Sequence, residues 1–190
     1  MKKTSFIAIA LLMMTTACTT ILVETTGPEG LTEDPGSRTA GAVVEDEAIQ
    51  TRIIVNMKSQ EPRFKNSNFN VISHNGVVLI VGQVQADELR TRASEIASQA
   101  SSKIKRIHNE LEVAGRTTFL ARTNDTWISS KVRLQLTANK EVPASQIRVV
   151  SNNGTVYLMG MVSQSEGDQA ALLARNVAGV AKVVKVFEYI

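Results

Sequence analysis

The one tryptophan of the chain indicates which chemistry its side chains could perform. Trp127 lies in a short segment that also holds Ser130, Lys131, Arg133 and Leu134. An indole ring prefers the headgroup boundary of a bilayer, and each Lys or Arg near an anionic bilayer adds on the order of 1 kcal/mol to binding. The segment is therefore suited to contact an anionic lipid surface. The alternative is that Trp127 covers a hydrophobic core between two domains.

Residue patterns typical of catalysis or metal binding are not found in the sequence. His74 is predicted to lie in a solvated hairpin turn and His108 on a surface strand, and neither has a metal-ligating residue at helical or paired short spacing. No Gly-rich phosphate loop or nucleophile elbow occurs. We therefore expect a non-enzymatic protein without cofactor or metal. An enzyme acting on envelope polymers would need paired carboxylates, and Asp125 and Glu166 cannot be placed in space from sequence alone.

The elements that must position these side chains occur twice. Residues 73–84 reappear as residues 151–162, and such a repeat fixes the domain organisation before any local motif is considered. In each copy an Asn-Gly pair, Asn75-Gly76 or Asn153-Gly154, supplies the positive φ angles of a two-residue hairpin turn. The flanking runs alternate and are rich in Val and Ile, which predicts strands. These strands cover residues 68–73, 77–84, 146–151 and 155–162.

An amphipathic helix is predicted before each hairpin. Apolar residues recur there at helical spacing, and Asp46 and Asp125 stand where an aspartate could cap the first free N–H groups. We therefore expect the two helices to begin at these aspartates. Their predicted core stripes are Ile49, Ile53, Asn56 and Met57 in the first copy and Ile128, Val132, Gln135 and Leu136 in the second.

A neighbouring face of the same helices differs between the copies. In the second copy this face carries Trp127, Lys131 and Leu134. The first copy has Ala48, Arg52 and Val55 at the corresponding positions. Only the second copy therefore adds an aromatic ring to a partly apolar second face.

Each copy continues beyond its hairpin with a helix and a strand. The Ala-rich stretches near 86–101 and 164–178 predict helices, and the β-rich runs 104–113 and 180–189 predict closing strands. The fold class is thus α+β, with two tandem αββαβ domains, each a three-stranded sheet covered on one side by two helices. We place the domains at residues 46–113 and 125–190, with a linker over 114–124. The rigidity of their arrangement stays open.

The N-terminal residues predict export and anchoring. Lys2 and Lys3 precede a short apolar run, and this is typical of a secretory signal peptide over residues 1–17. Thr15-Thr16-Ala17-Cys18 resembles a bacterial lipobox, which implies that Cys18 carries the lipid; the alternative is an incidental thiol. Thr19 in place of an aspartate implies sorting to the outer membrane. Residues 18–45, rich in Glu, Pro and Gly, then form a flexible acidic tether.

The charge of the processed chain argues against nucleic-acid binding. The whole chain carries 21 basic and 18 acidic residues, and two of the basic ones, Lys2 and Lys3, belong to the predicted signal peptide. Without them the chain is nearly neutral, so we expect no nucleic-acid partner.

The whole pattern resembles the paired BON domains of Gram-negative outer-membrane lipoproteins. Its most specific parts are residues 124–136 together with Val156-Tyr157-Leu158-Met159-Gly160. The resemblance implies a non-enzymatic, periplasm-facing protein that binds anionic, phosphatidylglycerol-like phospholipid through the first helix of its second domain. It also implies roles in envelope integrity, at division sites and near the outer-membrane protein assembly machinery. The alternative is a protein-interaction module that docks its Trp127 face on an envelope assembly protein.

Overall fold

The computed structural model describes residues 34–115 and 119–190. The predicted signal peptide, Cys18 and most of the predicted tether lie outside these residues. The first unit consists of α3 (Ala40–Gln60), a 3-10 turn (Pro62–Asn66), β1 (Asn68–His74), β2 (Val77–Val84), α4 (Asp87–Ser98) and β3 (Arg106–Val113). The second consists of α5 (Phe119–Ala138), a 3-10 turn (Ala144–Gln146), β4 (Arg148–Asn152), β5 (Thr155–Val162), α6 (Gln164–Arg175) and β6 (Lys182–Tyr189).

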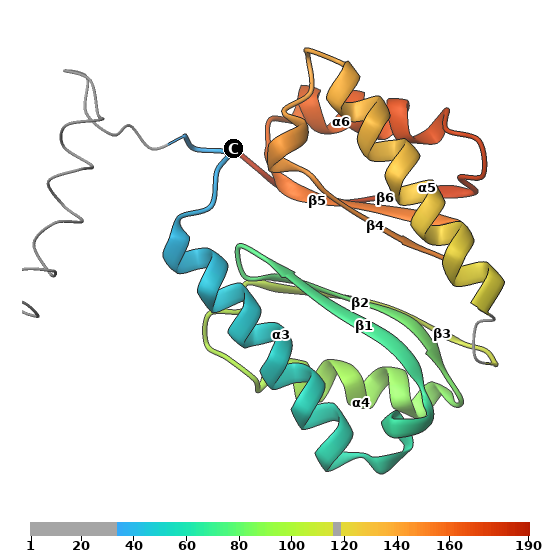
Figure 1. Cartoon of the computed structure of the whole chain (residues 1–190). Coiled ribbons are helices and arrows are strands. Elements are labelled where there is room, and N and C mark those ends of the chain that lie inside the picture. The colour runs from blue at the N-terminus through green and yellow to red at the C-terminus, as the bar shows by residue number, and fades with distance from the viewer. Residues whose placement is uncertain (1–33, 116–118) are drawn as a thin grey trace, which may run out of the picture. The chain divides into compact units, whose positions relative to one another are not determined.

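Both units have the predicted αββαβ order. The strand orders are β1-β2-β3 and β4-β5-β6, and in each sheet the hairpin is antiparallel while the closing strand runs parallel to the central one. Two helices cover one face of each sheet, α3 and α4 in the first unit and α5 and α6 in the second (Figure 1). The expected α+β fold is confirmed.

The hairpin turns have the predicted geometry. Asn75 and Gly76 have φ angles of 52° and 78°, and Asn153 and Gly154 have φ angles of 50° and 76°. Positive φ at both central residues defines the turn whose twist matches that of the flanking strands, and Asn-Gly adopts it at low cost. The turn therefore fixes the register of each hairpin.

The starts of α3 and α5 differ from the prediction. The helix α3 begins at Ala40, where the Thr39 side chain accepts a hydrogen bond from the Ala42 amide over 3.1 Å, and α5 begins at Phe119. Residues 40–45, expected in the tether, and residues 119–124, expected in the linker, are therefore helical. Asp46 and Asp125 lie inside helices and do not act as caps.

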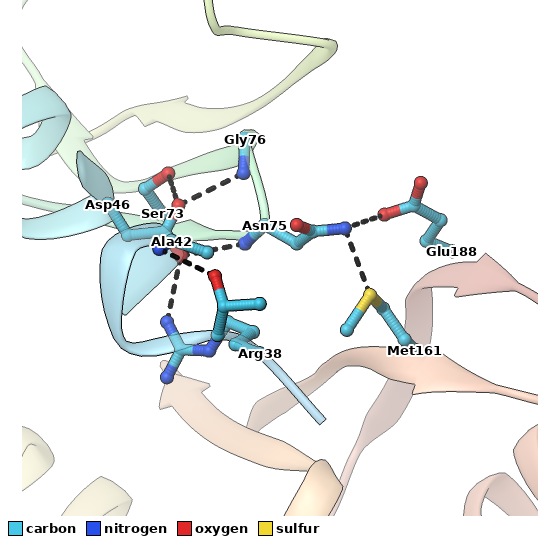
Figure 2. Close-up of polar contacts among 9 residues, drawn as sticks. Arg38, Ala42, Asp46, Ser73, Asn75, Gly76, Met161 and Glu188 are labelled. Atoms are coloured by element: carbon cyan, nitrogen blue, oxygen red, sulfur yellow. Dashed lines mark hydrogen bonds and ion pairs between the residues drawn. The ribbon is translucent and has the colours of Figure 1, made fainter. Parts of the chain in front are cut away.

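The two aspartates instead bind the hairpin turn of their own unit. Asp46 accepts hydrogen bonds from the backbone amides of Asn75 (2.8 Å) and Gly76 (3.0 Å), from the Ser73 hydroxyl (2.6 Å) and from the Arg38 guanidinium (2.8 Å), as Figure 2 shows. Burial opposes ionisation of Asp46, but these hydrogen bonds outweigh it and hold the pKa of its carboxyl below the ordinary value. The aspartate thus ties helix to turn.

The sheets are covered on their second faces as well. Each unit has its own hydrophobic core between sheet and helices. A third cluster joins side chains of both sheets, namely Ile72, Val77, Leu79, Val81, Tyr157, Met159 and Val186. Every residue of β2 is buried, as expected of a strand that is covered on both faces. The two units therefore share apolar surface.

Candidate membrane-contacting helix

The outer face of α5 exposes two large apolar side chains. Trp127 is 63% exposed and Leu134 is 71% exposed, and Ser130 is exposed between them. The spacing of these residues, together with Lys131, places all four on one side of a helix. Four of the residues predicted to contact lipid are therefore brought together.

The cation beside the indole is held in place. The Lys131 ammonium lies 5.8 Å from the centroid of the Trp127 ring and donates a hydrogen bond to the carbonyl of Ala178 over 2.5 Å. A cation over an indole face is favourable by about 0.5–1 kcal/mol at an exposed site. Within the described part of the chain Lys131 forms no ion pair, so its charge is not neutralised by a carboxylate.

Arg133 lies on a different face of α5. Its guanidinium donates to the carbonyl of Val149 in β4 over 3.1 Å. Ser129, one helical turn before it, donates to the Ser151 hydroxyl over 2.8 Å. Arg133 therefore faces β4, and the structure does not group it with Trp127 as the sequence prediction did. Cys18, the predicted lipidation site, lies outside the described residues.

The inner face of α5 anchors it on the sheet. Ile128, Val132 and Leu136 are at most 1% exposed and belong to the core of the second unit. Gln135, predicted in this stripe, is exposed, and Asn56 of the first unit is half-buried. The stripe is narrower than predicted because a residue one position from Leu136 is turned by about 100° around the helix.

A buried aspartate fixes α5 relative to the hairpin. Asp125, 8% exposed, accepts hydrogen bonds from the backbone amides of Asn153 (2.8 Å) and Gly154 (2.9 Å). These contacts repeat those of Asp46 in the first unit. The outer face of α5 thus belongs to a helix that is bonded to the hairpin, and a site on a helix holds its geometry better than a site on a loop.

The corresponding face of α3 has a different chemistry. Val55 is 56% exposed at the position of Leu134, but Ala48 takes the place of Trp127. Arg52, at the position of Lys131, pairs with Glu45 over 3.4 Å. This face of α3 therefore lacks the ring and has a paired cation, so the two faces are not equivalent.

Both histidines are at least partly buried. His74 is buried, contrary to the predicted solvated turn, and burial is the main cause that lowers its pKa to about 4. Neither ring nitrogen of His74 has a hydrogen-bond partner in the described structure. Burial also lowers the pKa of His108. No group of three His, Cys, Asp or Glu side chains in the described ranges could hold a metal ion.

None of the described helices combines the length and the apolar character needed to cross a bilayer.

Comparison with known proteins identifies the architecture. The BON domain family profile matches residues 45–115 and 124–190. The chain is 34% identical to the 21 kDa hemolysin of Actinobacillus pleuropneumoniae over 80% of this chain and 78% of that protein. It is 32% identical to the outer membrane lipoprotein DolP of Haemophilus influenzae over 80% and 79% of the two chains, and 25% identical to the osmotically-inducible protein Y of Escherichia coli over 79% and 75%.

Proposed function

The chain belongs to the BON-domain family, and we propose that its second unit binds anionic phospholipid through the outer face of α5. The single observation that carries the proposal is the exposed indole of Trp127 with the unneutralised Lys131 ammonium beside it. Ser130 and Leu134 complete the contact surface.

Physical arguments support a lipid surface as the ligand. Removing a large apolar side chain from water is favourable by about 1.5–3 kcal/mol, and Trp127 and Leu134 are both available for this. An indole prefers the headgroup boundary of a bilayer, and a nearby ammonium is attracted by anionic headgroups. The corresponding face of α3 has Ala48 in place of the ring and Arg52 paired with Glu45, which favours α5 as the contact.

A lipid anchor would complement this weak contact. We propose that Cys18 is acylated and that the protein resides in the outer membrane facing the periplasm, in agreement with its similarity to an outer membrane lipoprotein. Anchoring raises the local concentration of α5 near the bilayer, so a modest affinity suffices to orient the protein. Support of envelope integrity, with enrichment at division sites and near the outer-membrane protein assembly machinery, forms part of the proposal.

Vesicle co-sedimentation of residues 19–190 tests the proposal. Binding should rise with phosphatidylglycerol content and fall with salt. Trp127→Glu and Leu134→Glu should abolish it while circular dichroism stays unchanged. The matched control is Val55→Glu, which places the same charge at the equivalent exposed position of α3 and should leave binding intact.

The opposite result would favour another class of partner. If Trp127→Glu retains full binding to anionic vesicles, the α5 face is not the lipid contact. If the wild-type fragment ignores vesicles and an envelope assembly protein binds it through Trp127, the protein is an interaction module.

A further inference from the structure

A cleft lies on the other flank of α5, away from Trp127. It has a volume of about 330 Å³ and is bounded by α5, β4 and the edge strand β1. Arg122 and Arg133 of α5 and Arg148 at the start of β4 line it. Such a volume is at the lower end of the range of small-molecule sites, which is roughly 300–1,000 Å³.

The positive charge of the cleft is not balanced. None of the three arginines forms an ion pair in the described residues. One N–H group of Arg133 donates a hydrogen bond to the Val149 carbonyl. The acidic residue in the lining is Asp125, and both of its oxygens already accept backbone hydrogen bonds. The lining therefore carries three guanidinium groups against one engaged carboxylate.

One polar side chain of the cleft has a donor without an acceptor. Asn152 lines it, and its side-chain nitrogen is buried without a hydrogen-bond partner in the described structure, while its oxygen accepts from Gln83 over 3.4 Å. A buried amide nitrogen without an acceptor is unfavourable, and a bound acceptor would remove this cost.

We infer that this cleft binds a phosphate group carried by a small polar molecule. Guanidinium groups match the geometry of phosphate oxygens and form paired, charge-assisted hydrogen bonds with them. An excess of two positive charges suits a phosphate, which carries about −1.5 to −2 as a monoester. Beside the arginines the lining holds polar residues, such as Asn68 and Thr126, and apolar residues, such as Phe69. A cleft of this small size and mixed lining suits a headgroup or a small soluble phosphate ester. The inference does not depend on the proposed membrane contact, because the two sites use different faces of α5.

Titration of residues 19–190, followed by NMR, tests this inference. This fragment contains the compact folded part Pro35–Ile190, which includes both units. The probes are inorganic phosphate, glycerol 3-phosphate and vesicles that contain phosphatidylglycerol. Saturable shifts should appear at Arg122, Ser129, Arg148 and the Asn152 side-chain amide. Shifts with the two soluble probes would identify a soluble ester as the source, and shifts only with vesicles would identify a headgroup.

Variants separate the cleft from general charge effects. Arg122→Gln with Arg148→Gln should weaken binding of the probe by about tenfold or more, because each lost guanidinium removes charge-assisted hydrogen bonds. Arg175→Gln, an exposed arginine at the end of α6, is the matched control and should bind as the wild type does. Trp127→Glu should lose vesicle binding yet keep its response to a soluble probe.

Two results would overturn the inference. One is the absence of saturable shifts at the cleft residues with every probe in the folded wild-type chain. The other is equal weakening in the Arg175→Gln control. The first of these results needs only the NMR shifts of the wild-type chain. The test therefore does not depend on whether the variants fold.

Discussion

The side-chain amide of Asn75 donates a hydrogen bond to the carboxylate of Glu188 over 2.6 Å (Figure 2). Asn75 belongs to the hairpin turn of the first unit and Glu188 to the last strand of the second. Lys105 reaches the same carboxylate, with its ammonium 2.9 Å and 3.2 Å from the two oxygens. One carboxylate thus joins two loops of the first unit to β6.

We expect Glu188→Ala to lower the free energy of unfolding by about 1–2 kcal/mol, because hydrogen bonds to a partly buried charge are lost. Urea denaturation checks this. The matched control is Asp168→Asn, which removes an exposed pair with Lys185 and should have no measurable effect. Equal effects of the two substitutions would contradict a special role for Glu188.

Asp46→Asn should destabilise the protein by about 2–4 kcal/mol, because it leaves three donors of the hairpin and the Arg38 guanidinium ahead of α3 without a carboxylate. The folded pKa of Asp46 lies below its ordinary value, so the stabilisation is complete above that value and is lost as pH falls through the folded pKa. Unfolding measured across acidic pH should therefore show a steeper loss in the wild type than in Asp46→Asn. Asp87→Asn, an exposed aspartate, serves as control and should follow the wild type.

His74 should make stability depend on pH in a different window. Its pKa is about 4 in the folded protein against 6.5 ordinarily, so the unfolded chain binds the proton first. The contribution of neutral His74 to the free energy of unfolding is fully present above about pH 6.5. The free energy of unfolding then falls by roughly 3 kcal/mol as pH decreases to about 4. His74→Gln should flatten the unfolding free energy over this interval. An unchanged slope in that variant would show that His74 does not titrate there.

Trp127 provides a direct optical probe, since it is the only tryptophan. Its emission should be that of a water-exposed indole in solution and should shift to shorter wavelength with anionic vesicles. Lys131→Gln should weaken this response by about fivefold, in line with the loss of about 1 kcal/mol per cation. Arg52→Gln is the matched control in α3, and its vesicle titration should overlay that of the wild type.

Much of the fold follows from local chemistry. The Asn-Gly turns, the alternating strands and the repeat predict element order and sheet pairing. The predicted starts of the first helix in each unit were wrong. An aspartate ahead of an apolar stripe is typical of a helix cap, whereas Asp46 and Asp125 bind a hairpin turn far along the chain. That contact depends on the folded hairpin, and no local pattern distinguishes it from capping.

The spacing of residues in the sequence predicts only part of the candidate site. Trp127, Lys131 and Leu134 share a face because their spacing is helical. Arg133 was grouped with them through proximity in the sequence, although neighbouring helix residues point in different directions. Arg122 and Arg148 were not predicted as site residues because Arg122 lies in the predicted linker and Arg148 on a predicted strand. The recurrence of polar residues at 122, 126, 129 and 133 was the available signal.

The hydrophobic cluster between the two sheets has a consequence for the evolution of the duplication. Ile72 and Leu79 from one copy meet Tyr157 and Met159 from the other, so each copy serves as the partner that a single copy would need from a second molecule. The tandem chain is in this sense a covalently closed dimer. Separated copies would present an apolar sheet face to water and should self-associate, so the two copies are expected to fold together.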